Sequence, residues 1–158
     1  MRMPNLLPPA PGSSSPLWWF WERFTDLHTA AYKTSHGRIG GKAYGVPVAL
    51  VESVGRKSGK SRTHPLLCQA DGDNLVLIAS KGGTDRHPAW YHNLKASPET
   101  TAWWKGEKRS VRAREASGEE RDRLWRMMAD AYPDYENYQR RCDRQIPVVV
   151  LEPVSSGG

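Results

Sequence analysis

Short apolar runs separated by tight turns dominate the middle of the chain and limit the folds that it can adopt. Residues 46–54 and 75–80 are rich in apolar and β-branched side chains, a composition that favours strands. The other expected strands cover residues 63–70, 100–105, 108–115 and 147–151. These six short strands, joined mostly by hairpins, predict a six-stranded antiparallel barrel in a fold that is mainly β with helices (α+β).

Helical patterns precede and interrupt the expected strands. Residues 1–16 are rich in Pro, Ser and Gly, which predicts a disordered tail. Residues 17–34 carry aromatic side chains at helical spacing, which predicts an amphipathic helix. The other expected helices cover residues 87–96, 117–131 and 135–142. We therefore expect one barrel domain at residues 35–158, behind a tail and a helix.

Length and charge narrow the possible partners. The chain has 158 residues and a formal net charge of +6, so it can form one domain that favours an acidic partner. Nucleic acid, an anionic membrane surface and a polyanionic small molecule all fit. The two cysteines exclude a disulfide framework and favour a reduced, cytoplasmic setting. The aromatic helix over residues 17–32 is compatible with contact to the inner face of a membrane.

A basic turn between the first two expected strands is the most distinctive motif. Gly-Arg-Lys-Ser-Gly-Lys-Ser-Arg occupies residues 55–62. Glycine allows close approach of backbone amides to an anion, and the cations add charge-assisted hydrogen bonds. The plain alternative is a solvated hairpin tip. A Walker A loop is excluded, because only three residues separate Gly55 from Gly59 and the chain then runs into Pro65.

A second loop combines glycine with positive charge. Ser-Lys-Gly-Gly-Thr-Asp-Arg at residues 80–86 follows a buried strand, and it would lie near the basic turn if the two strands were neighbours. The alternative is an ordinary strand-to-helix loop. Within the next segment, Trp90 and Tyr91 can line a ring-shaped ligand or simply belong to the core.

Tyrosines recur at intervals of three from Tyr132 through Tyr135 to Tyr138. On a helix Tyr135 and Tyr138 share a face, and their hydroxyls can donate a proton or clamp a polar group. Helix packing explains the same spacing. The five histidines are scattered, so we expect His64 and His87 to be loop residues, and we expect no metal site.

Together these motifs resemble a known family. The blocks at residues 55–66, 79–83, 88–94, 132–138 and 144–153 are similar to those of the actinobacterial deazaflavin (F420)-dependent nitroreductases, also called F420-dependent quinone reductases. The likeness runs in the right order over about residues 35 to 153. It implies a split β-barrel like that of FMN-binding flavin reductases, holding coenzyme F420, an 8-hydroxy-5-deazaflavin with an oligoglutamate tail.

The resemblance also implies roles for individual residues. The phosphate and the acidic tail would be held by Arg56, Lys57, Ser58 and Arg62. The ring system or its linker would be bordered by Pro65, Leu66, Ala79, Ser80, Lys81, Trp90, Tyr91 and Asn93. Tyr135 matches the family tyrosine that faces coenzyme and substrate, with Tyr132 and Tyr138 alongside and Ser80 near the acceptor.

The implied activity is hydride transfer from reduced coenzyme F420 to a quinone or a nitroaromatic compound of the nitroimidazole type. An FMN-binding oxidase-like barrel and a non-catalytic F420 carrier remain as alternatives. Single-stranded nucleic acid is disfavoured, because the cations cluster in ligand-sized turns rather than along a stripe.

Overall fold

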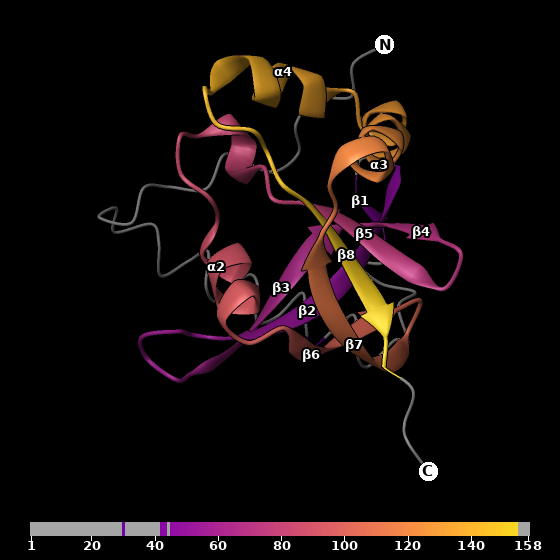
Figure 1. The fold of residues 1–158 in the computed structure, drawn as a ribbon. Helices are drawn as coiled ribbons and strands as arrows, with labels where there is room; N and C mark the ends of the chain where they lie inside the picture. Colours follow the sequence, from indigo (N-terminus) through magenta and orange to yellow (C-terminus); the bar gives the residue numbers. More distant parts are fainter. Residues whose placement is uncertain (1–29, 31–41, 44, 155–158) are drawn as a thin grey trace.

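The computed structural model describes residues 30, 42–43 and 45–154. The expected tail at residues 1–16 and helix at 17–34 lie outside the described residues, apart from residue 30. The described chain forms an antiparallel sheet that curls on itself, with helices packed against it (Figure 1). This arrangement confirms the expected mainly-β, α+β fold class.

The sheet contains eight strands in the described part of the chain. Their order is β1-β2-β6-β7-β8-β5-β4, and β3 pairs with β2 outside this path. Every pairing is antiparallel. The strands are β1 (Lys42–Ala43), β2 (Val46–Val54), β3 (Ser61–Leu67), β4 (Gln69–Asp71), β5 (Asn74–Ile78), β6 (Glu99–Trp104), β7 (Glu107–Glu115) and β8 (Val148–Pro153).

The expected number of six strands was too low for two reasons. The short strand β1 lies in the glycine-rich link, and the single strand expected over 63–70 is interrupted at Cys68. Before Cys68 the chain pairs with β2, and after it the chain pairs with β5. The backbone N–H of Cys68 still bonds to β2, donating to the carbonyl of Pro47 with N and O 2.9 Å apart. Cys68 is therefore the residue at which the chain leaves its pairing with β2 and turns to pair with β5.

Helices α2 (Ala89–Ala96), α3 (Gly118–Ala131) and α4 (Asp134–Arg141) lie at the expected positions, whereas the short 3₁₀ helix η1 (Lys81–Gly83) lies in a segment that was expected to be a loop. Pro88 and Pro133 precede α2 and α4, where the missing N–H of proline costs nothing because the first helical amides have no partner within the helix. Ser117 precedes α3 as expected, but its side chain makes no capping hydrogen bond.

Strands β5 and β8 separate two hydrophobic cores. On β5, Leu75 and Leu77 face the core that contains α2, whereas Val76 and Ile78 face the core under α3 and α4. The alternation follows from the period of two along a strand. Both faces of these central strands are therefore buried, and the helices on the two faces are held by one pair of strands.

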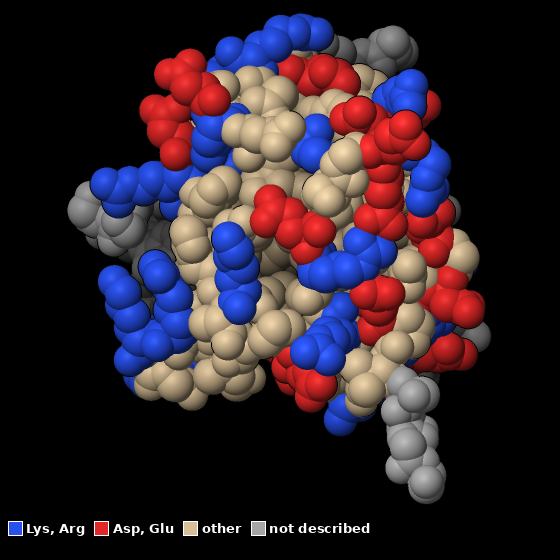
Figure 2. Space-filling model, in the orientation of Figure 1, with Lys and Arg blue, Asp and Glu red and all other residues tan. Residues whose placement is uncertain are grey.

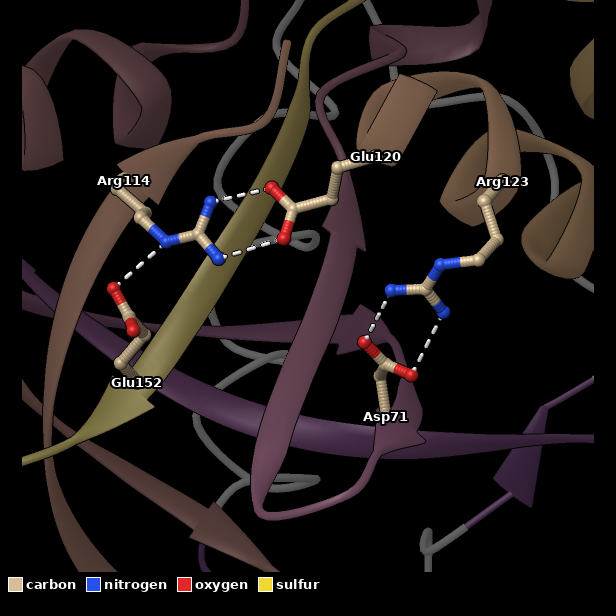
Figure 3. A network of polar contacts seen from close by, with 5 residues as sticks. All are labelled: Asp71, Arg114, Glu120, Arg123 and Glu152. Atoms are coloured by element: carbon tan, nitrogen blue, oxygen red, sulfur yellow. Dashed lines mark hydrogen bonds and ion pairs between the residues drawn. The ribbon is translucent and has the colours of Figure 1, made fainter. Parts of the chain in front are cut away.

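Helix α3 is also tied to the sheet by ion pairs (Figure 3). Both Nη atoms of Arg114 on β7 donate to the carboxylate of Glu120, at 2.6 and 2.9 Å, and its Nε donates to Glu152 at 2.7 Å. Arg123 on α3 donates to both carboxylate oxygens of Asp71, each at 3.0 Å. These bonds hold the pKa of Arg114 above and the pKa of Glu120 below the usual values.

Candidate functional site

The basic turn connects β2 to β3 and is closed by its own backbone. Gly55 N–H donates to the carbonyl of Lys60, and Gly59 N–H donates to the carbonyl of Gly55, each with N and O 2.8 Å apart. Gly59 has a φ of +70°, which favours glycine. The turn therefore brings its cations together on a short hydrogen-bonded loop.

The cations of this turn are exposed. Within the described residues, Arg56, Lys57 and Lys60 form no ion pair. Figure 2 shows blue side chains gathered at the lower left, where Figure 1 places the turn between β2 and β3. Unpaired cations on a short loop are suited to an anionic ligand.

A buried asparagine supports the turn from beneath. Asn93 on α2 is 7% exposed, and its Oδ1 accepts the backbone N–H of Arg56 at 3.1 Å. Its Nδ2 donates to Ser53 Oγ at 3.1 Å, and Ser53 Oγ lies 2.9 Å from His64 Nε2. Asn93 was expected at the coenzyme, and the structure places it under the turn that carries the cations.

Sequence reasoning missed the rest of this network. His64 was expected in a loop, but it lies on β3 opposite Val51, and Ser53 faces it from β2. Burial, and then the charge of Arg62, lower the pKa of His64 to about 4. The apolar composition of β2 gave one signal, since a serine that is buried on a strand of mostly apolar residues requires a hydrogen-bond partner.

The glycine loop lies elsewhere in the sheet than expected. It follows β5, which is separated from β2 by β6, β7 and β8, so the expectation of neighbouring strands was wrong. Antiparallel hairpins place strands by pairing rather than by chain order. In Figure 1 helix α2 lies between the basic turn and η1, and α2 contacts the turn through Asn93.

Within the glycine loop, Ala79 is buried, Ser80 is half-buried and Lys81 is exposed. A Cβ on Gly83 would lie 2.7 Å from Tyr138 Cα, closer than packed atoms tolerate, so glycine is required where the loop meets α4. On β3, Pro65 and Leu66 are half-buried.

The aromatic pair on α2 belongs to a core. Trp90 and Tyr91 are each 6% exposed and pack in the cluster beside β5 and β8. The Tyr91 hydroxyl donates to Glu115 Oε2 at 2.8 Å. Burial and this carboxylate raise the pKa of Tyr91 to about 12, so the phenol stays protonated. Contact of Trp90 or Tyr91 with a ring system stays a prediction.

The tyrosine segment forms an aromatic cluster on and before α4. The Tyr132 and Tyr138 hydroxyls lie 3.0 Å apart, and the Tyr135 ring centroid is 4.9 Å from that of Tyr132 and 6.2 Å from that of Tyr138. Tyr135 is 4% exposed, and burial raises its pKa. Its hydroxyl has no hydrogen-bond partner in the described part of the chain.

These features define a class of protein: a curled antiparallel sheet with a cationic turn and a buried tyrosine cluster, suited to an anionic ligand beside aromatic side chains. The model of the F420H(2)-dependent quinone reductase family matches residues 24–153. The chain belongs to this family, which confirms the resemblance seen in the sequence.

Comparison with individual relatives agrees with this family assignment. The chain is 40% identical over 129 residues to an F420H(2)-dependent quinone reductase of Mycobacterium tuberculosis, covering 79% of this chain and 87% of that protein. A solved F420-H2 dependent reductase superposes with a TM-score of 0.63 at 40% identity, over 67% of this chain and 94% of that chain. Another solved structure, described as a domain-swapped dimer, gives a TM-score of 0.65 at 34% identity, over 87% and 100% of the two chains.

Membership in the family confirms three expectations. The fold is the split barrel of the F420 reductases, the protein is an F420H(2)-dependent quinone reductase, and its coenzyme is F420. The donor set of the structure fits this coenzyme, because the cations without ion pairs at Arg56, Lys57 and Lys60 suit an acidic tail. No helix among the described residues has the length and hydropathy that crossing a membrane requires.

Proposed function

We propose that this chain reduces quinones, and electron-poor nitroaromatic compounds as further acceptors, with the basic turn holding the acidic tail and Tyr135 beside the acceptor. When bound, the reduced deazaflavin supplies a hydride, and a quinone takes up that hydride and one proton to become the hydroquinone. The residues of the chain bind, orient and shield the reactants.

The cations of the basic turn are the observation that carries this proposal. Arg56 and Lys57 are exposed, and neither has an ion pair within the described residues. The backbone of Arg56 is fixed by Asn93, so its position is set before a ligand arrives. A preformed cationic turn loses little conformational entropy on binding a polyanion.

Neutralising the turn tests the proposal. Arg56→Gln with Lys57→Gln should weaken binding of coenzyme F420 about tenfold at low salt, at up to about 1 kcal/mol for each exposed charge pair. Fluorescence titration of the coenzyme measures this. Arg112→Gln with Arg126→Gln removes the same charge elsewhere and should leave affinity unchanged. Equal affinities of the two double variants would contradict the proposal.

The buried hydroxyl of Tyr135 suits a second role. A phenol that is 4% exposed and lacks a hydrogen-bond partner among the described residues is costly unless a group beyond those residues, such as a ligand, supplies the partner. Its raised pKa keeps the proton on the oxygen, so the group can donate to an acceptor oxygen or position it.

Tyr135→Phe should lower kcat about a hundredfold, within the range for lost proton donation, while the dissociation constant of the coenzyme stays unchanged. Stopped-flow oxidation of the reduced coenzyme by menadione and by a nitroimidazole measures both acceptor classes. Tyr138→Phe, which removes a hydroxyl already bonded to Tyr132, should lower kcat by less. Full turnover by Tyr135→Phe would contradict the role of Tyr135 in donating to or positioning the acceptor.

The two earlier alternatives have separate tests. FMN carries one phosphate and no acidic tail, so it should bind more weakly than coenzyme F420. In the double variant Arg56→Gln with Lys57→Gln, the difference in affinity between the two coenzymes should be smaller. A non-catalytic carrier would bind the reduced coenzyme without oxidising it in the presence of menadione.

A further inference from the structure

The side chain of Arg144 binds the backbone of the glycine loop at several points. Arg144 lies between α4 and β8, and its guanidinium donates to backbone carbonyls of three loop residues. Nε donates to Thr84 at 2.8 Å, Nη1 to Ala79 at 3.2 Å and Nη2 to Ser80 at 2.7 Å. Charge-assisted bonds to carbonyls are stronger than neutral ones, so one side chain holds both ends of η1.

The fourth contact of the Arg144 guanidinium determines the protonation state of His87. Arg144 Nη1 lies 2.9 Å from His87 Nδ1. Arginine only donates and stays charged in proteins, so His87 Nδ1 must accept and His87 must be neutral with its proton on Nε2. All four contacts reach residues 79–87.

The loop contains one strained residue, Lys81, because a positive φ is costly for a residue with a side chain but not for glycine. Lys81, Gly82 and Gly83 have φ values of 46°, 66° and 80°, three left-handed residues in succession. The conformation costs Lys81 about 1–2 kcal/mol. The loop closes through only a few backbone bonds, among them Gly83 N–H to the Ser80 carbonyl at 2.9 Å. Bonds from Arg144 oppose relaxation of this strain.

The same arginine is fixed to the tyrosine helix. Gln139 on α4 donates from Nε2 to the Arg144 carbonyl at 2.8 Å, and Gly83 packs against the Tyr138 backbone without space for a Cβ. Arg144 therefore connects α4, which carries Tyr135, to the loop that carries Ser80 and Lys81.

We propose that Arg144 is a positioning residue for hydride transfer, setting the gap between the loop at residues 79–87 and the tyrosine helix α4. The inference rests on the proposed function, in which these two segments border coenzyme and acceptor. In this role Arg144 acts through its four contacts with residues 79–87. Small changes in the gap change the rate strongly, because transfer requires a near-attack geometry.

The four contacts of the Arg144 guanidinium with residues 79–87, which we call the clamp, depend on pH through His87. Protonation of Nδ1 removes the acceptor and places a cation against Arg144. Burial is the first cause that lowers the pKa of His87, so the neutral form and the clamp are complete above the usual histidine pKa and are lost as the pH falls through the lowered value. The charged and titratable groups that face His87 are Tyr91, His92 and Lys95 on α2, Glu115 on β7 and Arg144.

The test compares Arg144→Gln and Arg144→Lys with Arg126→Gln, a control of equal charge at an exposed position on α3. Hydrogen exchange of residues 79–87 is measured without coenzyme, and oxidation of reduced coenzyme F420 by menadione is measured on the same samples. In Arg144→Gln, exchange should rise and kcat should fall, each by at least about tenfold. Arg144→Lys should recover part of both, and Arg126→Gln should match the native chain.

Unchanged exchange in Arg144→Gln would overturn the clamp, and faster exchange with unchanged kcat would overturn its role in transfer. His87→Asn serves where Arg144→Gln fails to fold, since it keeps an acceptor that does not titrate. The native loop should lose protection as the pH falls below the usual histidine pKa and through the lowered pKa of His87, and this variant should not. Equal pH dependence would overturn the proposal.

Failure of the proposed function gives a different result. A native chain that binds but does not oxidise the reduced coenzyme overturns that function and the role of Arg144 in turnover together. Hydrogen exchange still decides separately whether Arg144 holds the loop.

Discussion

The side-chain amide of Asn93 has only one orientation that satisfies its neighbours. The Arg56 backbone N–H can only donate, so it must face Asn93 Oδ1, and Nδ2 must then donate to Ser53 Oγ. The Ser53 hydroxyl keeps its own proton and a second lone pair, so it can donate to His64 Nε2 or accept from it. Burial, followed by the charge of Arg62, lowers the pKa of His64 to about 4, so the ring is neutral at neutral pH in either arrangement.

Removing the titration of His64 should flatten the pH dependence of stability. The folded state resists protonation of His64 between its usual pKa of 6.5 and about 4. The contribution of neutral His64 to the free energy of unfolding is therefore complete above that range and is lost as the pH falls. Between pH about 7 and about 5 the native free energy of unfolding should fall by about 2 kcal/mol more than that of His64→Gln.

Urea unfolding of both chains at the two pH values measures this difference. The other histidines with lowered pKa, His87 and His92, remain in the variant and cancel in the comparison. Parallel pH dependence of the two chains would show that His64 does not titrate against folding.

At the scale of elements, α3 is held to the sheet by packing and by Arg114. The guanidinium binds Glu120 at both oxygens and also reaches Glu152 (Figure 3). These side chains are between 36% and 46% exposed, so water screens the attraction and packing must supply most of the stability. The ion pairs set the register of α3 on β7 and β8.

Arg114→Met should lower the free energy of unfolding by about 1 kcal/mol at low salt, the upper range for exposed pairs with good geometry. High salt should reduce this loss. Arg112→Met is the matched control two residues earlier on β7, where the nearest carboxylate oxygen, of Glu99, lies 4.0 Å away. Urea unfolding at two salt concentrations measures both, and equal losses in the two variants would contradict the expectation.

Local pattern predicted the elements better than their contacts. The strand at 46–54 was expected at the bounds where β2 lies, because apolar composition and β-branching are local features. The break at Cys68 depends on which ladder each half joins, and no local feature encodes that choice. Asn93 was expected near a ligand from resemblance, but its bond to Arg56 spans 37 positions. The contacts of Arg144 with Ala79 and Ser80 span 65 and 64 positions and were not anticipated.

At the scale of the molecule, charge is distributed unevenly. The whole chain carries a formal charge of +6. Carboxylates at Asp71, Glu120 and Glu152 are paired with arginines beside α3, whereas Arg56 and Lys57 have no ion pair in the described part of the chain. The resulting field attracts anions toward the turn between β2 and β3 (Figure 2).

Coenzyme binding should therefore depend on salt, and binding of a neutral quinone should not. Raising the ionic strength from about 0.01 to about 0.15 M shortens the screening length from about 30 to about 8 Å. The dissociation constant of coenzyme F420 should rise severalfold, while the KM for menadione stays constant. Titration and steady-state kinetics at the two ionic strengths measure this, and a salt-independent dissociation constant would contradict the role of the turn.

The break in the strand at Cys68 also provides a chemical reporter. The thiol is fully buried, and burial raises its pKa to about 12, so the reactive thiolate is scarce in the folded protein. Modification by a thiol reagent requires this side chain to become exposed, as it does when the crossing from β3 to β4 opens. Cys142 is buried as well, so the rate of alkylation of Cys68, located by peptide mapping, times the opening of this crossing in the native chain without any engineered label.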